Sequence, residues 1–434
     1  MGNFSQLLRT NRNYRNLWLG QVVSEVGDHF NTVAVLSLSL KMTGSGGVVG
    51  GVIIARVLTL GLAGMVAGVV LDRFDRRWVM IWSDLFRAAV AISYIALLYW
   101  PNVTLLYVLS GALFLGSPFF TSGRSAILPR ITSPGELHTA NALTQTTAWL
   151  TLSIGAGIGG VSTVKLGYEW AFVVNSLSFL FSALALAALK SDTGDFKPAG
   201  IGSGTANRTA FTRDWGEGIR YMRGTPLVAG IALGYVGWAS GGGAAQMLFT
   251  LFAERVFHTG AAGLGFLWGM AGVGLVLGGM LGHRLLPRLS YVQYKRVVTG
   301  AHFLHGSFYV LFAVMPTIAL SALFILLSRV AMGTNNVLNR TMLLTHVPDG
   351  LRGRVFTAVE TLTNVTMMIS LAAAGAASAI YDDRTIGLIA GLLSTSTALF
   401  WGLANLAGKL PEPPLEAANP PDPAEDVRET RAAG

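Results

Sequence analysis

The chain has 434 residues, of which 52% are hydrophobic and only 12% are charged, and its mean hydropathy is +0.54. Soluble domains carry about 25% charged residues, so this sequence has too few polar side chains to cover a soluble fold of its length. The composition excludes a secreted, a nucleic-acid-binding or an ordinary cytosolic protein and indicates an integral membrane protein. Because the chain has no cysteine, disulfides, thiolate metal sites and cysteine nucleophiles are excluded as well.

The basic excess and the N-terminus fit the same class. The formal net charge is +9, and membrane proteins concentrate Lys and Arg in their cytoplasmic loops, so the charge requires no nucleic-acid partner. The first sixteen residues are polar and basic, and no small-residue cleavage site ends the apolar span that follows. We therefore expect a retained first helix and no signal peptide.

A helix that crosses a bilayer needs about 20 mostly apolar residues. Twelve such stretches follow one another along the chain, which predicts an all-α integral membrane protein with twelve transmembrane helices. Their ranges are Leu17–Leu40, Gly47–Leu71, Trp78–Trp100, Thr104–Phe120, Thr139–Thr163, Trp170–Leu189, Leu227–Phe252, Gly260–Leu286, Arg296–Val314, Thr317–Val337, Val355–Ala379 and Thr385–Leu406.

The basic residues predict the orientation of these spans. With both termini in the cytoplasm, four of the 31 Lys and Arg residues lie in outer loops, three lie within spans, and the remaining 24 lie in cytoplasmic segments. Such a distribution obeys the positive-inside rule, so we expect both termini to be cytoplasmic. The residues in the outer loops are Lys41, Lys165, Arg255 and Arg384, and those within spans are Arg56, Arg87 and Arg329.

The longest interior polar stretch divides six spans from six. We expect an N-terminal six-helix bundle over 1–189, a cytoplasmic linker over 190–225, a C-terminal six-helix bundle over 226–410, and a disordered cytoplasmic tail over 411–434, which is Pro-rich and acidic. The linker begins rich in Gly and Pro. It then places Phe211, Trp215 and Ile219 four residues apart among charges, which predicts a short amphipathic helix on the inner membrane face.

The loop between the second and third spans carries a recognisable motif. Its sequence GVVLDRFDRR, at Gly68–Arg77, resembles the signature Gly-x-x-x-Asp-Arg-x-Gly-Arg-Arg/Lys of the major facilitator superfamily, with Asp75 where most members have Gly. The segments LWLGQVVSEVGDHF, SDLFRA and VPDGLRGRV, which start at Leu17, Ser83 and Val347, are similar to the branch of macrolide-efflux and enterobactin-exporter-type transporters. The resemblance covers the chain up to about Leu410 and implies the major facilitator fold, two six-helix bundles related as repeats.

The resemblance also implies a cytoplasmic latch. Asp72 would accept amide N–H bonds at the start of span eleven, where the helix dipole is positive, and the arginines of the loop would pair with Asp84 just inside span three. A solvated basic loop without a gating role is the alternative. The candidate gate residues are Gly68, Asp72, Arg73, Arg76, Arg77, Asp84, Arg87, Arg352 and Arg354.

Charges inside the spans are candidates for function, because an ionisable group at the bilayer centre costs about 2.5 to 3.5 kcal/mol. Glu25 and Asp28 adjoin on one face of the first span, and Arg56 of the second span lies at a similar depth. A carboxylate in a low-dielectric cavity holds a proton and releases it when a cation approaches, so these three residues are the predicted proton-coupling group. A permanent Asp28–Arg56 ion pair without a transport role is the alternative.

The resemblance places spans one, four, seven and ten around a central cavity, with Arg329 opposite Glu25 and Asp28. Each aromatic residue there has packing as its alternative role. The candidate cavity residues are Ser117, Thr121, Tyr235, Trp238, Gln246, Arg329, Asn335 and Asn336.

Other motifs do not support another chemistry. Gly155, Gly157 and Gly160 match the spacing of a dinucleotide-binding loop, but they lie within an apolar helix and not after a strand, so close helix packing is the better interpretation. His302 and His305 have no further ligand nearby, which favours packing or lipid contact over a metal site. The sequence has no P-loop. We therefore expect neither an enzyme nor a bound cofactor or metal.

These features together indicate a secondary active transporter. The resemblance implies proton-coupled export of amphipathic organic compounds, such as a macrolide drug or a siderophore, by alternating access from a bacterial cytoplasmic (inner) membrane. The expected partners are a small-molecule substrate, the lipid bilayer and protons, with the proton gradient as energy source and a monomer as the assembly. A lysolipid flippase or a metabolite uptake carrier on the same scaffold is the alternative, and a polytopic membrane enzyme or sensor is a weaker one.

Overall fold

The structure is a computed structural model that describes residues 2–190, 196–197 and 208–413, and every regular element in these ranges is helical. The Gly- and Pro-rich part of the predicted linker and the predicted tail from residue 414 lie outside the described residues. Within the described ranges, eleven helices are long and apolar enough to cross a membrane. The helix α2 (Arg12–Thr43) has sufficient length at 32 residues, but polar residues such as Glu25, Asp28 and Asn31 lower its hydropathy. An all-α multi-pass membrane architecture is thus confirmed, and a twelfth span stays a prediction.

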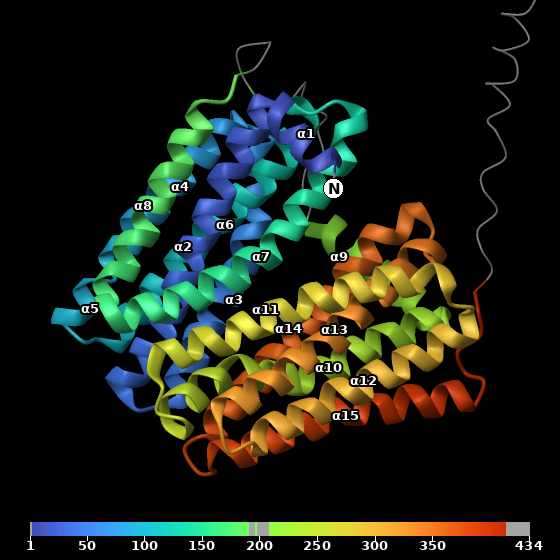
Figure 1. Cartoon of the computed structure of the whole chain (residues 1–434). Coiled ribbons are helices and arrows are strands. Elements are labelled where there is room, and N and C mark those ends of the chain that lie inside the picture. The colour runs from blue at the N-terminus through green and yellow to red at the C-terminus, as the bar shows by residue number, and fades with distance from the viewer. Residues whose placement is uncertain (1, 191–195, 198–207, 414–434) are drawn as a thin grey trace, which may run out of the picture.

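Figure 1 shows the helices in two groups that are inclined to each other. The N-terminal group consists of α1 (Gly2–Thr10), α2, α3 (Gly46–Leu71), α4 (Arg76–Ser93), α5 (Ala96–Tyr99), α6 (Val103–Ile131), α7 (Pro134–Leu166) and α8 (Tyr168–Ala187). The helix α9 (Arg208–Gly224) leads into the C-terminal group, which consists of α10 (Pro226–Leu251), the π-helical turn η1 (Phe252–Val256), α11 (Gly260–Leu285), the 3-10 turn η2 (Leu286–Arg288), α12 (Tyr291–Val314), α13 (Ile318–His346), α14 (Asp349–Ala377) and α15 (Asp383–Leu406).

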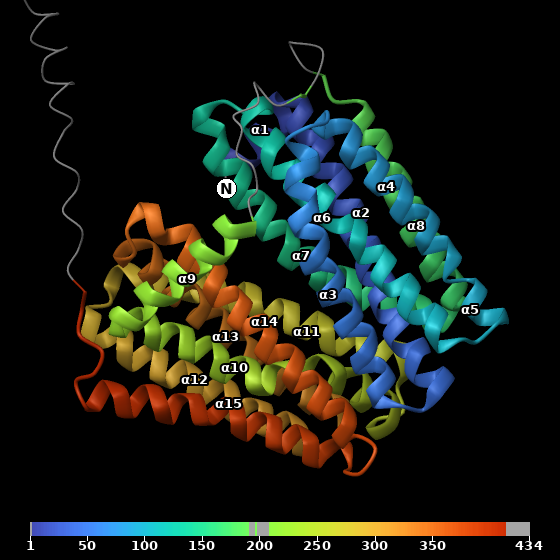
Figure 2. The same cartoon turned by 180° about the vertical axis from the view of Figure 1, so that it is seen from behind.

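The same packing arrangement occurs in both groups. In the N-terminal group α2 packs against α7 and α8, α6 packs against α3 and α4, and α4 packs against α8. In the C-terminal group α10 packs against α14 and α15, α13 packs against α11 and α12, and α12 packs against α15. The partners occur in the same order along the chain, as an internal repeat of a six-helix unit produces. Figure 2 shows the two units from behind.

The two groups share a hydrophobic core at one end only. Helices α7 and α11 pack together across the groups, as do α3 and α14. At the end where α2 and α10 finish, one cluster of buried apolar side chains contains Val35 and Leu38 from α2 together with Leu248 from α10. At the opposite end each group has a cluster of its own, around Tyr14 in the first and around Tyr294 in the second. The groups are therefore joined at one end and separate at the other.

Polar side chains determine where several of the long helices begin. At the starts of α2, α3, α6, α13 and α15, a side-chain oxygen accepts the backbone N–H three residues later, which satisfies an otherwise unpaired donor. Gly44 ends α2 with a φ of 65°, a conformation that a residue without a Cβ adopts at little cost. The capping residues are Asn11, Ser45, Asn102, Thr317 and Asp382.

Some helices continue beyond the apolar stretches that predict them. The apolar stretch of span four ends at Phe120, whereas α6 continues to Ile131. Arg124, which the sequence places in a cytoplasmic segment, therefore lies on a helix, and its side chain is largely buried at 19% exposure. Hydropathy ends the span too early here because the last turns of α6 carry several polar residues, of which Arg124 faces the protein interior. The predicted amphipathic helix is also present as α9, and it packs against α14 and α10; Trp215 and Ile219 contact the C-terminal core.

Glycines bring α7 and α11 into backbone contact near the joined end. A Cβ added at Gly160 of α7 would lie 2.9 Å from the Cα of Gly265 on α11, and a Cβ added at Gly265 would lie 2.9 Å from the Cα of Gly160. No side chain fits between backbones at this distance, so the close-packing interpretation of this glycine-rich stretch agrees with the structure.

We expect Gly160→Ala to destabilise the protein by about 1 to 3 kcal/mol, because the added methyl group must separate two packed helices. Gly157→Ala is the matched control, since a Cβ at this position on the same helix meets nothing within 4 Å. Unfolding of the purified protein in detergent, followed by tryptophan fluorescence, measures the difference. Equal stability of the two variants would show that the α7–α11 contact is not tight.

Candidate functional site

Arg87 lies at the centre of a buried group of charges in the N-terminal group. It projects from α4 and pairs with Asp84 one turn earlier, and its Nη1 lies 3.8 Å from Oδ2 of Asp28 on α2. The side chains of Arg87 and Asp84 are 4% and 0% exposed, whereas that of Asp28 is 35% exposed. The ring of Phe179 lies 4.3 Å from the guanidinium carbon. One buried arginine therefore serves two carboxylates, of which only Asp28 is accessible.

Glu25 forms a second ion pair close to the first. Its Oε1 lies 3.6 Å from Nη1 of Arg124 on α6 and accepts a hydrogen bond of 2.8 Å from Nε2 of Gln21. Its Oε2 accepts a hydrogen bond of 2.9 Å from the hydroxyl of Thr151 on α7. Three helices thus converge on one carboxylate. Arg124, Gln21 and Thr151 are absent from the predicted site, although Arg124 lies two helical turns after Ser117 and hence on the same face of α6.

Arg56 does not take the predicted place beside Asp28. Its guanidinium donates to Oγ1 of Thr32 at 3.2 Å and to Oδ1 of Asn31 at 3.3 Å, both on α2. The ring of Phe114 lies 5.0 Å from it. Asp28 pairs with Arg87 instead, which argues against the alternative of a permanent Asp28–Arg56 ion pair. Neutral hydrogen-bond acceptors and an aromatic face surround the Arg56 charge.

A cavity of about 300 Å³ lies beside these charges, and it is bounded by α2, α4, α6 and α7. Predicted residues on its wall are Glu25, Asp28 and Ser117. The predicted Thr121 is one turn further along α6, where its hydroxyl donates to the carbonyl oxygen of Ser117 at 3.2 Å. The wall of the cavity consists of Glu25, Asp28, His29, Thr32, Arg87, Leu113, Phe114, Ser117 and Ala148.

A second cavity of about 570 Å³ lies between α7 and the C-terminal group. The predicted residues Tyr235, Trp238 and Asn336 line it, and α7 contributes Gln145 and Trp149. The neighbouring residue Ala148 lines the smaller cavity, so the two cavities adjoin along α7. The remaining wall consists of Met332, Val337, Arg340, Leu343, Phe356, Val359, Glu360, Thr363 and Asn364.

Three predicted cavity residues face other helices of the C-terminal group. Asn335 bonds to a ring nitrogen of His302 at 3.0 Å, in the contact between α13 and α12. Nε2 of Gln246 lies 2.9 Å from the sulfur of Met367 on α14. Arg329 is 7% exposed, and its partners are the sulfur of Met332 at 3.1 Å and the ring of Phe249 at 5.8 Å.

The prediction that these three residues line the cavity is therefore corrected. Neighbouring residues on a helix point about 100° apart, so Asn336 reaches the cavity while Asn335 faces α12. Arg329 contacts its own helix group and not Glu25 or Asp28. His302 and His305 are both buried at 3% exposure, which agrees with packing. Within the described residues, no group of three or more His, Asp or Glu side chains could hold a metal ion.

The predicted gate residues bond within their own halves. Arg76 donates to the carbonyl oxygen of Ala126 at 3.1 Å and Arg77 to that of Leu189 at 3.0 Å. The expected pairing of these arginines with Asp84 is corrected, since Asp84 lies two turns into α4 and is bonded to Arg87. The remaining members lie at the helix ends: Gly68 and Asp72 at the end of α3, Arg73 exposed in the loop, Arg352 paired with Asp349, and Arg354 paired with Glu217 of α9.

Asp75, the departure from the motif, has a structural role of its own. It is the N-cap of α4, and its Oδ1 accepts the backbone N–H groups of Arg77 at 2.9 Å and Trp78 at 3.2 Å. Its Oδ2 accepts the N–H of Phe196 at 2.9 Å. A glycine at this position could supply none of these three bonds, so Asp75 ties the start of α4 to the segment after α8.

At the joined end, η1 carries contacts that cross between the groups. Glu254 accepts a hydrogen bond from the hydroxyl of Ser37 on α2. Arg255 donates to the carbonyl oxygen of Gly44 at the end of α2 and pairs with Asp383 of α15 at 3.3 Å. A π-helical turn adds a residue to the helix and is frequent at functional sites. Here the turn places two successive charged side chains across the contact.

Comparisons with known proteins agree with this architecture. Residues 17–371 match the family model described as the Major Facilitator Superfamily. The chain is 29% identical over 378 residues to the enterobactin exporter EntS of Escherichia coli O6:K15:H31 (strain 536 / UPEC), covering 83% of each chain.

Solved structures with a similar fold include the nucleoside transporter NupG, at a TM-score of 0.70 and 12% identity over 89% of this chain and 99% of that one. A bacterial homologue of the iron transporter ferroportin in an inward-facing state has a TM-score of 0.65 and 17% identity over 90% and 98% of the two chains. At these identities the likeness concerns the fold alone. These relatives and fold neighbours are transporters, not enzymes.

We expect Arg87→Met to destabilise the protein by about 3 to 5 kcal/mol, because it leaves the fully buried Asp84 carboxylate without a counter-charge. Adding Asp84→Asn to this variant should recover most of the loss, since the uncompensated charge is then removed. Thermal unfolding in detergent compares the variants, with Arg73→Met on the exposed loop as the control that changes little. A double variant no more stable than Arg87→Met alone would contradict the pairing.

Proposed function

The chain belongs to the Major Facilitator Superfamily, and from this premise we propose that it exports amphipathic organic compounds in exchange for protons. One observation carries the proposal: the adjoining cavities have unlike walls. Two carboxylates paired with arginines, Asp28 and Glu25, face the smaller cavity. Aromatic side chains including Tyr235 and Trp238 face the larger one. The first wall suits proton exchange, and the second suits a bulky and partly apolar substrate.

The coupling step follows from the geometry at Asp28. Its contact with Arg87, at 3.8 Å, is longer than a hydrogen bond, and its side chain is accessible. When Asp28 takes up a proton, Arg87 keeps Asp84 as its counter-charge and therefore remains compensated in the interior. When a proton leaves, Arg87 stabilises the Asp28 anion. Protonation thus changes the charge of the cavity wall by one unit without leaving a buried charge unpaired.

Glu25 would adjust the same step from one turn away. Its carboxylate already has Arg124, Gln21 and Thr151 as partners, whereas Asp28 has a single ion contact, with Arg87. We assign the titrating role to Asp28 and a supporting electrostatic role to Glu25. Arg56 stays with the neutral acceptors of α2, where its fixed charge contributes to the field around Asp28.

The substrate class follows from the larger cavity and from the relative. Indole and phenol faces of Trp149, Trp238 and Tyr235 offer stacking surfaces, and Gln145 and Asn336 offer hydrogen bonds. The relative with 29% identity exports enterobactin, as its name states. A siderophore is therefore the first substrate to test and a macrolide drug the second. The same cavity on an uptake carrier or a lysolipid flippase would show itself by solute entry or by lipid movement.

In an alternating-access cycle, this conformation would be the one that is open toward the cytoplasm. With twelve spans and both termini in the cytoplasm, as the basic residues predict, the joined end of the helix groups faces outward and the separate end faces the cytoplasm. The bundles would comprise 1–189 and 226–410 in a bacterial inner membrane. The Asp72 latch to the start of α14 would form when the cytoplasmic ends close, and the contacts of Glu254 and Arg255 would then break. The chain works as a monomer in this proposal, because its own two helix groups supply the walls of both cavities.

We expect Asp28→Asn to abolish proton-coupled transport, lowering it by at least about tenfold, because the variant cannot exchange a proton. Substrate-driven proton flux in proteoliposomes measures coupling, and compound accumulation in an efflux-deficient bacterium measures export. Glu169→Gln, an exposed carboxylate at the start of α8, is the matched control. Proton flux that survives Asp28→Asn would reject the coupling site, and faster accumulation of the compound in cells would indicate uptake instead of export.

We expect Arg255→Gln to open the outward end, because it removes a contact to α2 and an ion pair to α15. The chain has no cysteine, so a single Ser117→Cys reporter in the smaller cavity can be labelled specifically. Labelling of intact cells by a membrane-impermeant maleimide should rise several-fold in Arg255→Gln. Arg384→Gln is the control, because Arg384 bonds only to carbonyl oxygens of its own helix group, at Ala313 and Met315, among the contacts described. Equal labelling of both variants would contradict the role of Arg255.

A further inference from the structure

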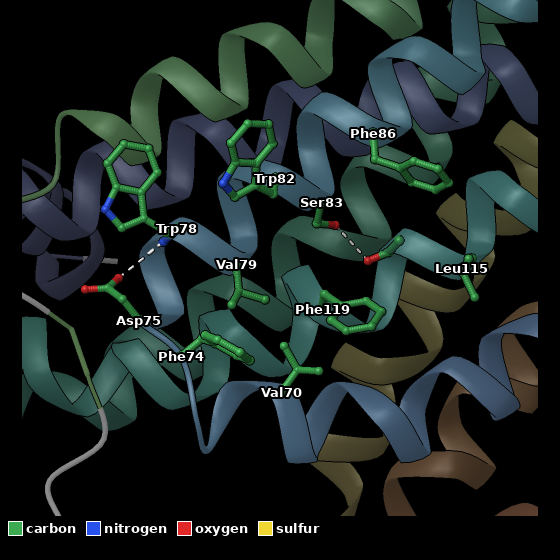
Figure 3. Close-up of a pocket in the computed structure, with 11 residues that line it drawn as sticks. Val70, Phe74, Asp75, Trp78, Val79, Trp82, Ser83, Phe86, Leu115 and Phe119 are labelled. Atoms are coloured by element: carbon green, nitrogen blue, oxygen red, sulfur yellow. Dashed lines mark hydrogen bonds between the residues drawn. The ribbon is translucent and has the colours of Figure 1, made fainter.

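A groove of about 620 Å³ runs along the membrane-facing side of the N-terminal group, between α3, α4 and α6 (Figure 3). Trp78, Trp82 and Phe86 line it at four-residue intervals along α4, and Phe74 and Phe119 line it from the loop and from α6. The groove is exposed, since Trp82 is 67% and Trp78 50% accessible. It is separate from both central cavities, with which it shares no lining residue.

The lining of the groove offers little to a polar ligand. Apart from the indole N–H groups, its polar side chains are those of Asp75 and Ser83. Asp75 accepts three backbone N–H groups as the cap of α4, and Ser83 donates to the carbonyl oxygen of Gly116 at 2.8 Å; Figure 3 shows two of these bonds. An apolar chain therefore fits the groove better than a hydrogen-bonding solute does.

The length of the groove matches one leaflet of a bilayer. From Arg76 to Phe86, α4 rises by about 15 Å at 1.5 Å per residue. This is half of the hydrocarbon thickness of about 30 Å. Tryptophans such as Trp78, near the end of the span, are typical of the interface between hydrocarbon and headgroups. A single acyl chain from one leaflet would follow the groove from end to end.

The end of the groove near Asp75 is basic. Arg73 is exposed in the loop, and Arg76 and Arg77 begin α4. Arg130 of α6 lies close enough to interact electrostatically with Arg76. These four arginines outnumber the two acidic residues at this end, Asp72 and Asp75, and leave an excess of positive charge at the level where a headgroup would lie. Basic clusters of this kind attract anionic lipids by about 1 kcal/mol per residue.

We propose that this groove binds one anionic phospholipid, with an acyl chain along Trp78, Trp82 and Phe86 and the phosphate beside Arg73. A lipid bound in the groove would influence the buried charges around Arg87, because Gly116 of α6 lines the groove and packs against the side chain of Arg87. A Cβ added at Gly116 would lie 2.7 Å from Cγ of Arg87, so only the backbone of α6 separates the lipid from the stem of Arg87. Binding itself does not depend on the proposed transport activity, and its test requires no substrate.

The test uses the full chain in nanodiscs of phosphatidylcholine that contain a minor fraction of lipid with brominated acyl chains, which quench nearby tryptophans. We expect brominated phosphatidylglycerol to quench the fluorescence more than the same fraction of brominated phosphatidylcholine. This excess should fall by at least half in Trp82→Phe and should persist in Trp100→Phe, whose indole is 71% exposed outside the groove. Arg73→Gln should abolish the excess while retaining every tryptophan.

Arg288→Gln is the matched charge control, because Arg288 is exposed in η2, the turn that corresponds to the α3–α4 loop in the second repeat. The excess should persist in this variant. Equal quenching by the two brominated lipids in the unmodified chain would overturn the proposal, since the groove would then hold ordinary bilayer lipid. An excess that survives both Trp82→Phe and Arg73→Gln would also overturn it, by placing the lipid elsewhere. All variants must elute as single species of unchanged size before comparison.

Discussion

The arrangement of this protein depends on a hydrophobic core that the two helix groups share at one end only. Apolar side chains of α2 and α10 form one continuous cluster there, whereas the opposite ends have separate clusters. Because lipid tails are as apolar as these side chains, close packing and not the exclusion of water is the main favourable term in such a contact. Helix α2 takes part in both regions, because its last turns, with Val35 and Leu38, lie in the shared core and its earlier turns carry Glu25 and Asp28. A change at the charges and a change at the core therefore occur on one rigid element.

The buried charges of the N-terminal group have their partners inside that group. Arg87 has two carboxylates, Arg124 has one, and Arg56 has neutral oxygens and an aromatic face. An unpaired ion in a low-dielectric interior is far more costly than a paired one, which explains why the N-terminal group keeps its arginines and carboxylates together. The C-terminal group instead surrounds Arg329 with Met332 and Phe249.

Much of the fold and part of the site could be predicted from the sequence. Length and hydropathy predict twelve spans, and eleven helices within the described ranges are long and apolar enough to be such spans. Isolated charges in an apolar stretch point to Glu25 and Asp28. Arg124 is missed by the sequence analysis because hydropathy ends the predicted span at Phe120, before the polar last turns of α6. The sequence assigns Arg87 and Asp84 to the cytoplasmic gate because they follow the basic loop closely, although α4 directs both side chains inward. Asn335 and Asn336 differ only in their direction around α13, which depends on how α12 and α13 pack and not on residue type.

The glycine contact between α7 and α11 also has a mechanical consequence. Gly160 lies near the joined end, and α7 continues from it to Pro134 for about 39 Å at 1.5 Å per residue. Two backbones in direct contact act as a fulcrum, because little displacement is needed at the point where they touch. A rotation of about 10° around that point would move the distant end of α7 by about 7 Å over a lever arm of this length. Small adjustments at the fulcrum would thus be amplified into much larger displacements at the distant end of α7.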